Sequence, residues 1–443
     1  MKVVHVPFCF APDAVGGTEI FVSHLTRDLN KMGVTSVVAA PGRKSSEYEV
    51  GGTKVYRFGI KSEIEDAIEL YGAGDATAQA EFERILDEVR PDVVHLHAWT
   101  SAVSLRLVRA AKKRDIAVVF TYHTPTVTCQ RGTLRLWGTM ICDGEMRVRR
   151  CTACTLNGLG VSRFMAVTLG QLPTAVGKCL GELGLDGGVW TALRYSHLVD
   201  TRHRTFHEMA DEVDHVVAVC SWVRELLLRN GVEARKLSLS RQGIDWPETA
   251  ASETAADRLN DTVRTVFIGR LDPAKGLDVI LDVLRAMPDL KVTLDVYGIV
   301  QGPANAAYRE AMLSKAAGDR RIVFKEPLAT NAVVSQLRQY DFIVVPSMWL
   351  ETGPMVVLEA FAAGVPVLGW KIGGISELVR SEVDGILVEP FSIEGWMDVL
   401  RRVAQDRQLH ARLKAGIREP RKIVEVAIEM KDLYQRLRAG SLH

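Results

Sequence analysis

The chain has 443 residues, more than one hydrophobic core ordinarily serves, so its length predicts two domains. Its formal net charge of +1 argues against a protein that binds nucleic acid through bulk charge. Hydrophobic residues make up 47% and charged residues 25% of the chain, as in a water-soluble globular protein. No uninterrupted apolar run reaches the roughly 18 residues of a membrane-spanning helix.

The N-terminal stretch MKVVHVPFCF reads as a short β-strand. It lacks the basic start and the small-residue cleavage site of a signal peptide. We therefore expect a cytoplasmic protein, in which the seven cysteines are mostly reduced and disulfides are absent.

Short apolar runs alternate with amphipathic segments in both halves of the chain, which predicts two parallel sheets covered by helices. The first half has strand-like runs at 3–8, 35–41, 55–59, 92–98, 116–123 and 214–221, and helix-like segments at 20–33, 76–89, 101–115 and 222–230. The second half has strand-like runs at 263–270, 291–298, 321–326, 341–347 and 365–370, and helix-like segments at 276–287, 304–317, 331–340 and 421–440.

These patterns place an N-terminal domain at residues 1–245, with a Cys-rich and then helical insertion at 124–210. A polar, Ala- and Thr-rich linker is expected at 246–262. The C-terminal domain follows at 263–420, and a last helix at 421–443 is expected to pack back on the N-terminal domain.

The stretch ETGPMVVLEAFAAGVPVLGW carries two glutamates around seven uncharged residues. It predicts a strand that ends at Ser347, a loop with Glu351, and a helix with Pro354 in its first position. Such a helix start suits a phosphate, and carboxylates suit pairs of hydroxyls. Glu351 and Glu359 would then contact the two hydroxylated ends of a nucleotide sugar. Alternatively, Glu351 only complements the helix dipole and Glu359 is solvated.

Two cations follow a strand in FIGRLDPAKGLDVIL. The strand is expected to end at Gly269, with Arg270 and Lys275 on the loop and Gly276 at the start of the next helix. An arginine fork and a lysine point charge suit a diphosphate. A pair of surface cations is the other interpretation.

Two features of the first half point to the same kind of site. Gly16 and Gly17 separate a strand from a helix, where glycines let a ligand approach the backbone, and His123 ends the strand of FTYHTP. The glycines do not form the GxGxxG pattern, which disfavours NAD. A plain turn and a structural histidine are the alternatives. Ligands of doubly wound sheets bind beyond the carboxyl ends of the strands, so we expect a cleft shared by the two domains.

In this order, the glycine pair, TYH, GRLDPAKG and the E-x7-E stretch resemble retaining glycosyltransferase family 4. The resemblance covers nearly the whole chain and is weakest over residues 124–210. It implies the GT-B fold, two Rossmann-like, doubly wound α/β domains that face a central cleft. It also implies a catalytic set of His123, Arg270, Lys275 and Glu351. The donor-binding set that it implies is Gly16, Gly17, Arg270, Lys275, Gly353, Met355, Val356 and Glu359.

The activity implied by the resemblance is retaining transfer of a sugar from a nucleotide-diphosphate sugar to a hydroxyl of a glycan, a lipid-linked or a small-molecule acceptor. The chain contains no Asp-x-Asp pair, so Arg270, Lys275 and the helix dipole are expected to replace a metal at the diphosphate. The alternatives are an epimerase or phosphorylase of the same fold and a non-catalytic nucleotide-sugar-binding partner. The donor, the acceptor, the linkage and the oligomeric state stay open.

Four of the cysteines, Cys129, Cys142, Cys151 and Cys154, fall within 26 residues, and the last two form a C-x2-C pair. Four thiolates suit a closed structural zinc site, although the usual paired spacing is absent. An iron–sulfur cluster would use the same ligands, and thiols without a metal are the remaining interpretation. The neighbouring arginines at 147, 149 and 150 would meet an anionic acceptor or be solvated.

Residues 155–200 are apolar but are interrupted by Arg163, Lys178 and Glu182, so they cannot span a bilayer. We expect helices on the acceptor side of the site, with a peripheral contact to a membrane surface where a lipid-linked acceptor would lie.

Overall fold

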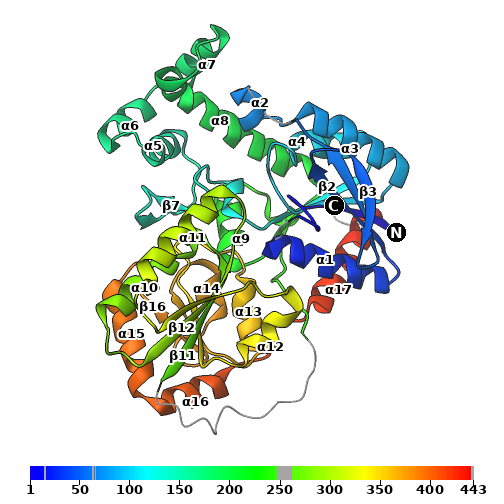
Figure 1. The fold of residues 1–443 in the computed structure, drawn as a ribbon. Helices are drawn as coiled ribbons and strands as arrows, with labels where there is room; N and C mark the ends of the chain where they lie inside the picture. The colour runs from blue at the N-terminus through cyan, green and yellow to red at the C-terminus, as the bar shows by residue number, and fades with distance from the viewer. Residues whose placement is uncertain (14–15, 62–63, 65, 247–261, 441–443) are drawn as a thin grey trace. The chain divides into compact units, whose positions relative to one another are not determined.

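The computed structural model describes residues 1–13, 16–61, 64, 66–246 and 262–440 (Figure 1). Contacts within the chain divide it into two compact units, Met1–Arg241 with Ile423–His443, and Gln242–Lys422. Each unit is built on one mainly parallel sheet, which confirms the predicted α/β fold class. The linker predicted at 246–262 lies, apart from its two end residues, outside the described residues.

The regular elements are listed here by unit. The first unit has strands β1 (Lys2–Val6), β2 (Thr35–Gly42), β3 (Ser46–Val50), β4 (Thr53–Gly59), β5 (Val93–Leu96), β6 (Ala117–Tyr122), β7 (Arg135–Leu136), β8 (Met140–Ile141), β9 (His215–Ala218) and β10 (Leu237–Leu239). Its helices are α1 (Gly17–Lys31), α2 (Ala67–Tyr71), α3 (Ala76–Val89), α4 (Leu105–Lys112), α5 (Val148–Gly158), α6 (Arg163–Gly170), α7 (Thr174–Glu182), α8 (Gly188–Glu212), α9 (Ser221–Arg229) and α17 (Ile423–Arg438), with 3-10 turns η1 (Pro125–Val127) and η2 (Ala234–Lys236).

The second unit follows the same alternation. Its strands are β11 (Val263–Arg270), β12 (Val292–Ile299), β13 (Ile322–Lys325), β14 (Phe342–Val345), β15 (Val367–Trp370) and β16 (Gly385–Val388). Its helices are α10 (Leu277–Ala286), α11 (Pro303–Ala316), α12 (Val333–Leu337), α13 (Met355–Ala362), α14 (Gly373–Leu378), α15 (Ile393–Gln405) and α16 (Arg407–Gly416), with 3-10 turns η4 (Pro273–Lys275) and η5 (Thr330–Ala332).

The sheet of the first unit has the order β10-β9-β6-β5-β1-β2-β4-β3. Its strands pair in parallel except at the edge, where β3 and β4 form an antiparallel hairpin. Strand order reverses between β1 and β5, because β2 continues the sheet on one side of β1 and β6 continues it on the other side of β5. The loops after β1 and β5 therefore leave in opposite directions and open a space at their carboxyl ends.

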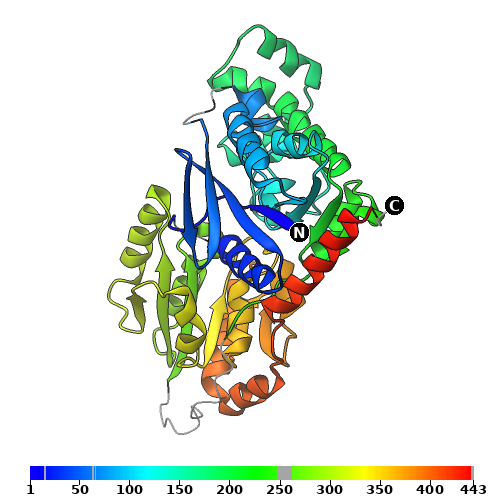
Figure 2. The same ribbon diagram turned by 90° about the vertical axis from the view of Figure 1, so that its right-hand side faces the viewer.

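The C-terminal helix completes the first unit. Helix α17 packs along α1, and Figure 2 shows the two side by side (α1 blue, α17 red). Lys431 donates a hydrogen bond to the carbonyl of Met32 at 3.0 Å, and the buried Tyr434 hydroxyl lies 2.6 Å from His95 Nδ1 on β5. The helix thus reaches the centre of the sheet, although it comes from the other end of the chain.

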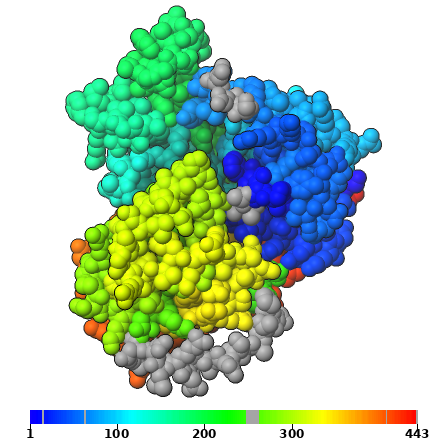
Figure 3. All heavy atoms as spheres, viewed as in Figure 1, coloured from blue at the N-terminus to red at the C-terminus, as the bar shows by residue number. Residues whose placement is uncertain are grey.

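The predicted insertion forms a helical subdomain around the 25-residue helix α8. Helices α2, α5, α6 and α7 all pack against α8, and a small core of Leu156, Ala166, Tyr195, Leu198 and Val199 joins them. In the space-filling view the α6–α7 part projects from the rest of its unit (Figure 3). Within the residues described, no helix combines the length and the apolar composition that crossing a lipid bilayer requires.

The second unit has the sheet order β13-β12-β11-β14-β15-β16, and all five pairings are parallel. Counted along the unit, this is 3-2-1-4-5-6, the order of a doubly wound Rossmann sheet. Helices cover both faces. The core around α10, α15 and α16 fills one face, and the core around α12, α13 and α14 fills the other. Strand order reverses between β11 and β14, where a ligand site is expected.

Two local predictions need correction. Pro354 does not occupy the first helical position, because its ψ of 104° is extended and α13 begins one residue later at Met355. The strand predicted to run to Ser347 ends at Val345, and the following residues form the loop. The hairpin strand β3 was missed, since its sequence SEYEV has only two large apolar residues and lies at an exposed edge.

Candidate functional site

Two loops meet where strand order reverses in the second unit. Arg270 is the last residue of β11, which ends one residue later than predicted, and Lys275 lies on the loop that follows it. Glu351 lies on the loop after β14. The N–H of Met348 donates to the carbonyl of Ala274 at 2.7 Å, so the loops are directly joined. Tertiary structure thus brings together Lys275 and Glu351, which are separated by 76 residues in the chain.

Gly276 permits this close approach. It has a φ of +69°, and a Cβ atom there would lie 2.0 Å from the carbonyl oxygen of Pro346 on the other loop. Any larger residue would be strained by its backbone angle and would also push the loops apart. Glycine at this position is therefore a requirement of the loop contact that positions Lys275.

The centre of this site is an ion pair. Lys275 Nζ lies 2.5 Å from Glu351 Oε1, which also accepts a hydrogen bond from Ser347 Oγ at 2.8 Å. Glu351 is buried, and Lys275 is mostly buried with its ammonium 5.3 Å from the centre of the Trp349 ring. A buried carboxylate must keep such partners, because an uncompensated charge in this position is costly. Glu351 is thus held in one orientation.

Backbone contacts also hold Glu351. The N–H of Gly374, after β15, donates to the carbonyl of Glu351 at 2.6 Å. A Cβ at Gly374 would lie 2.8 Å from that oxygen, so glycine is needed for the approach. The Gly373–Gly374 pair was missed in the sequence analysis. Two glycines directly after a predicted buried strand are the signal that could have revealed it.

Arg270 is less constrained than Lys275. Its side chain is 40% exposed, its Nη1 lies 3.4 Å from Gln301 Oε1, and its Nε lies 3.6 Å from Asp272 Oδ2. These contacts are long, so the guanidinium can turn toward an anion at small cost. The same edge also contains the start of α13, where the N–H groups of Met355 and Val356 have no acceptor within the helix.

Glu359 lies on α13, half-buried, and no described residue forms an ion pair or hydrogen bond with its carboxylate. Burial raises the pKa of Glu359 from 4.5 to about 7. A carboxyl that is desolvated without a cation is unfavourable for the fold, and such groups are typical of binding sites. Gly353, just before the helix, lies against the side chain of Gln242, where a Cβ would be 2.5 Å from Oε1.

The first unit has a site of a different character. Gly16 caps α1 and Gly17 begins it, and the Gly16 N–H donates to the Glu19 carboxylate at 2.9 Å. This acidic side chain occupies the start of the helix, so the glycine pair offers backbone access without favouring a phosphate. Phe21, on the same helix, contacts His123 with ring centroids 5.2 Å apart.

His123 belongs to a chain of buried histidines that the sequence analysis missed. His5 Nδ1 lies 3.0 Å from His97 Nε2, and His97 Nδ1 lies 3.1 Å from His123 Nε2. Burial lowers the pKa of His5 and of His123 to about 3 and lowers that of His97 as well. All three rings are therefore neutral near pH 7. Since a neutral His97 donates once and accepts once, both hydrogen bonds run in the same direction, and the tautomer of His123 is coupled to that of His5.

The arrangement of these buried histidines also resembles a metal-binding site. Ligand atoms of His5, His95 and His97 all lie within 4.8 Å of one another. However, His95 bonds Tyr434 through Nδ1 and Thr121 through Nε2, both at 2.6 Å. A metal at His95 would have to break one of these short bonds. The cluster is better explained as a hydrogen-bonded support for His123.

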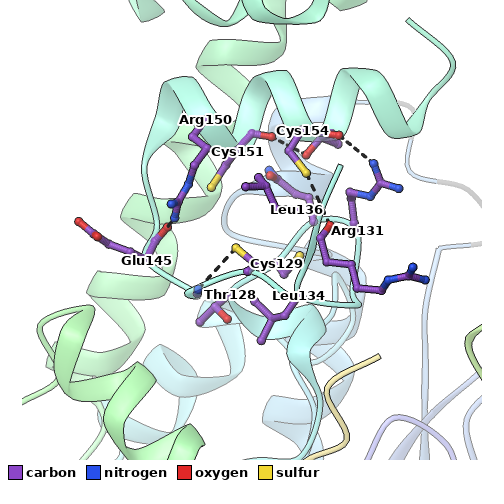
Figure 4. A pocket seen from close by; sticks show the side chains of 14 residues that line it. Thr128, Cys129, Arg131, Leu134, Leu136, Glu145, Arg150, Cys151 and Cys154 are labelled. Carbon is purple, nitrogen blue, oxygen red and sulfur yellow. Dashed lines mark hydrogen bonds between the residues drawn. The ribbon is translucent and has the colours of Figure 1, made fainter. Parts of the chain in front are cut away.

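The four predicted cysteine ligands line one cavity of about 30 Å³ in the first unit (Figure 4). In the described residues, no three of their sulfur atoms lie within 4.8 Å of one another. Burial raises the pKa of the Cys151 thiol to about 11 and also raises that of Cys142. Such thiols are protonated at neutral pH, which excludes them as activated nucleophiles.

Comparison with known proteins assigns the family. Residues 16–240 match the family model for a glycosyl transferase 4-like domain, and residues 254–419 match the model for glycosyl transferases group 1. The chain belongs to the glycosyl transferase 4-like family. It is a glycosyltransferase, as predicted, and the implied GT-B fold is confirmed.

Similar proteins agree with this assignment. The glycosyltransferase is 25% identical to a D-inositol 3-phosphate glycosyltransferase of Xylanimonas cellulosilytica, over 95% of this chain and 91% of the relative. It is 34% identical to a protein of the same name from Saccharomonospora viridis, over 38% of this chain and 41% of the relative.

Solved structures share its fold. Sucrose-phosphate synthase of Thermosynechococcus elongatus has a TM-score of 0.67 at 18% identity and covers 100% of both chains. Anabaena Alr3699/HepE in complex with UDP and glucose has a TM-score of 0.62 at 14% identity, over 98% of this chain and 99% of that one.

The raised pKa of Glu359 leads to a test by thermal unfolding. Between pH 4.5 and 7 the folded chain keeps a proton that the unfolded chain loses, so this residue destabilises the fold increasingly up to about pH 7. We expect Glu359→Gln to raise Tm at pH 8 by more than at pH 5.5. Scanning calorimetry at both values checks this. A Tm difference that does not grow with pH would mean that Glu359 has an ordinary pKa.

Proposed function

We propose that this glycosyltransferase transfers a sugar from a nucleotide-diphosphate sugar, with retention of configuration and without a catalytic metal. The observation that carries the proposal is the ion pair of Lys275 with the buried Glu351, fixed at the point where strand order reverses. The donor class also accords with Alr3699/HepE, whose complexes contain UDP and UDP-glucose.

In this proposal the cations of the second unit bind the diphosphate. The ammonium of Lys275 makes an ionic contact with the phosphates, and the guanidinium of Arg270 can donate two hydrogen bonds to them. The N–H groups at the start of α13 add a partial positive charge. Charge that develops on the leaving diphosphate is then stabilised by groups already in place. In this proposal Arg270 and Lys275 take the place of a divalent cation at the phosphates.

Glu351 and Glu359 bind hydroxyl groups at the two ends of the donor. Glu351, oriented by Lys275 and Ser347, accepts hydrogen bonds from hydroxyls of the sugar. Glu359 accepts hydrogen bonds from the ribose hydroxyls, which supply the partners that its carboxylate otherwise lacks. In the first unit, Gly16 and Gly17 offer backbone to the donor and His123 offers one neutral ring nitrogen to the sugar.

Retention follows if the acceptor hydroxyl attacks from the face on which the diphosphate leaves. The diphosphate oxygen can then take the acceptor's proton, so no protein base and no covalent intermediate are needed. The histidine chain stays neutral and keeps its orientation during the reaction.

The first experiment measures transfer itself. We expect Glu351→Gln to lower the rate of transfer or of donor hydrolysis at least tenfold, about 1.4 kcal/mol in barrier, with the fold retained. Glu394→Gln, at an exposed position of α15, is the matched control and should leave the rate unchanged. A screen of nucleotide sugars by thermal shift identifies the donor, and proton NMR of the product reads the anomeric configuration.

Near-normal turnover by the Glu351→Gln variant would reject its role. A purified protein that binds nucleotide sugars but neither transfers nor hydrolyses them would favour the alternative of a non-catalytic partner. Inverted product would reject retention while leaving the donor assignment intact.

A second experiment isolates the diphosphate. We expect Arg270→Ala and Lys275→Ala each to weaken the binding of UDP about tenfold or more, since each loses a charge-assisted contact. Titration calorimetry measures the affinity, with Arg401→Ala, exposed on α15, as the control. Excess EDTA should leave transfer unchanged. Unchanged UDP affinity in both variants, or loss of transfer in EDTA that returns with Mg²⁺, would contradict the proposed diphosphate site.

The acceptor side of the proposal rests on the exposed surface of the helical subdomain. Eight of the nineteen large apolar side chains that are exposed in the described residues lie between residues 159 and 190. Phe164 is 80% exposed and Val189 is 74% exposed, and Trp190 lies next to Val189. Exposed phenylalanine and tryptophan side chains on helices favour the interface of a bilayer. We infer a lipid-linked acceptor that is reached at a membrane surface.

Vesicle flotation tests this contact. We expect the protein to float with phosphatidylcholine vesicles that contain anionic lipid, and the double variant Phe164→Ser and Val189→Ser to float severalfold less. Ile428→Ser, which removes an apolar side chain that is 49% exposed on α17, should float as the unmodified protein does. Protein that stays wholly in the soluble fraction with every vesicle composition would reject a membrane-bound acceptor.

A further inference from the structure

The four cysteines between β6 and α5 are separate from the donor residues of the proposed function. Cys129 follows η1, Cys142 follows β8, and Cys151 and Cys154 lie on α5. All four line the same cavity. Figure 4 shows Cys151 and Cys154 directed from α5 toward the loop that contains Cys129 on the opposite side. Three separate parts of the chain thus bring thiols to one enclosed place.

Helix α5 presents its two cysteines as a pair. Residues three apart in a helix lie on the same face, so Cys151 and Cys154 can bind one centre together. Cys151 is in the first turn of α5 and Cys154 follows it one turn later, so both thiols lie near the start of the helix. The C-x2-C spacing therefore has the geometry of one half of a four-thiolate site.

The surroundings supply hydrogen-bond donors for sulfur. The N–H of Trp137 donates to Cys154 Sγ at 3.3 Å, and the N–H of Gly144 donates to Cys142 Sγ at 3.5 Å. Two further donors that line the cavity, Gln130 Nε2 and Arg150 Nε, are buried without an acceptor in the described part of the chain. Buried N–H groups without acceptors are costly, and metal-bound thiolates would satisfy them.

Positive charge is present as well. Arg131, Arg135 and Arg150 line the cavity, and Arg131 Nη1 donates to the carbonyl of Cys154 at 3.0 Å. Arg150 is partly neutralised by Asp143, at 2.5 Å and 2.7 Å. Four thiolates around one Zn²⁺ leave a net charge of −2, and an oxidised four-thiolate iron–sulfur cluster has the same sign. The remaining guanidinium charge offsets this negative charge.

The segment from Cys129 to Arg147 is held by the buried Leu134 and by hydrogen bonds such as those of Asn230 with Met146 and Gly144. Its regular structure is the hairpin of β7 and β8, each of two residues, and the side chains of Met140 and Ile141 on this hairpin are about half exposed. Such a hairpin is not stable by burial of its own surface. A metal bound by Cys129 and Cys142 as well as by the two cysteines of α5 would attach the segment to that helix.

The geometry points to a thiolate metal centre held by Cys129, Cys142, Cys151 and Cys154, with Zn²⁺ or an iron–sulfur cluster as its occupant. Its role is structural, because four protein ligands leave no open position for substrate. Zinc–sulfur bonds of about 2.3 Å would bring the sulfurs to about 3.8 Å from one another, so zinc requires the side chains to turn inward. A cluster accepts a wider separation of the sulfurs.

Metal analysis of the full chain tests this inference. Protein is purified without chelators under nitrogen, and zinc, iron and acid-labile sulfide are measured per chain. We expect about one equivalent of zinc, or iron and sulfide together with visible absorbance. X-ray absorption at the metal edge should then show sulfur ligands only. Less than about half an equivalent of either metal, after reconstitution with Zn²⁺ or with iron and sulfide, overturns the inference.

Single-cysteine variants test which residues bind the metal. Cys151→Ser and Cys154→Ser should lose the metal and lower Tm, whereas Cys179→Ser, an exposed thiol on α7, should keep both. Because a ligand variant can fail to fold, alkylation of the unmodified protein gives an independent measurement. The four proposed ligands should react only after metal is removed. Four thiols that are alkylated at once in the native protein, or are found as disulfides, would overturn the inference. UDP binding, set by the second unit, distinguishes this failure from failure of the proposed function.

Discussion

The contact between the loop after β11 and the loop after β14 is the constraint on which the donor site depends. Parallel strands whose order reverses send these loops apart, and the ion pair of Lys275 with Glu351 closes them again at one point. Gly276 and Gly374 make the closure possible, because a side chain at either place would collide with a backbone carbonyl. Replacing Lys275 and Glu351 by apolar residues would remove the ion pair that joins the two loops.

The ionisable side chains of the two units lie in different environments. In the second unit, Arg270 is partly exposed, Glu351 is buried beside Lys275, and Glu359 is desolvated without a cation. In the first unit, four histidines at the centre of the sheet are held neutral by burial. A neutral histidine can orient a hydroxyl without attracting the phosphates.

The helical subdomain has a small core and many exposed apolar side chains. Helices α5 to α8 bury a small core of five residues, which leaves many apolar side chains of α6 and α7 exposed. The loop before α5 contains Cys129 and Cys142, which line one cavity with Cys151 and Cys154 of α5. The exposure of these apolar side chains follows from the small size of the subdomain, because a small unit buries too little area to cover every apolar residue.

The sequence by itself determined the fold class and most of the parallel strands, because strands buried on both faces leave continuous apolar runs such as DFIVVPS and IAVVFTYH. It also determined the family, since GRLDPAKG and the E-x7-E stretch can be read without knowing what they contact. Only the tertiary structure decided that Lys275 pairs with Glu351 and that His5, His97 and His123 form one hydrogen-bonded chain. Those contacts join residues from different strands, and the order of strands in a parallel sheet is set by crossover packing, which no local pattern records.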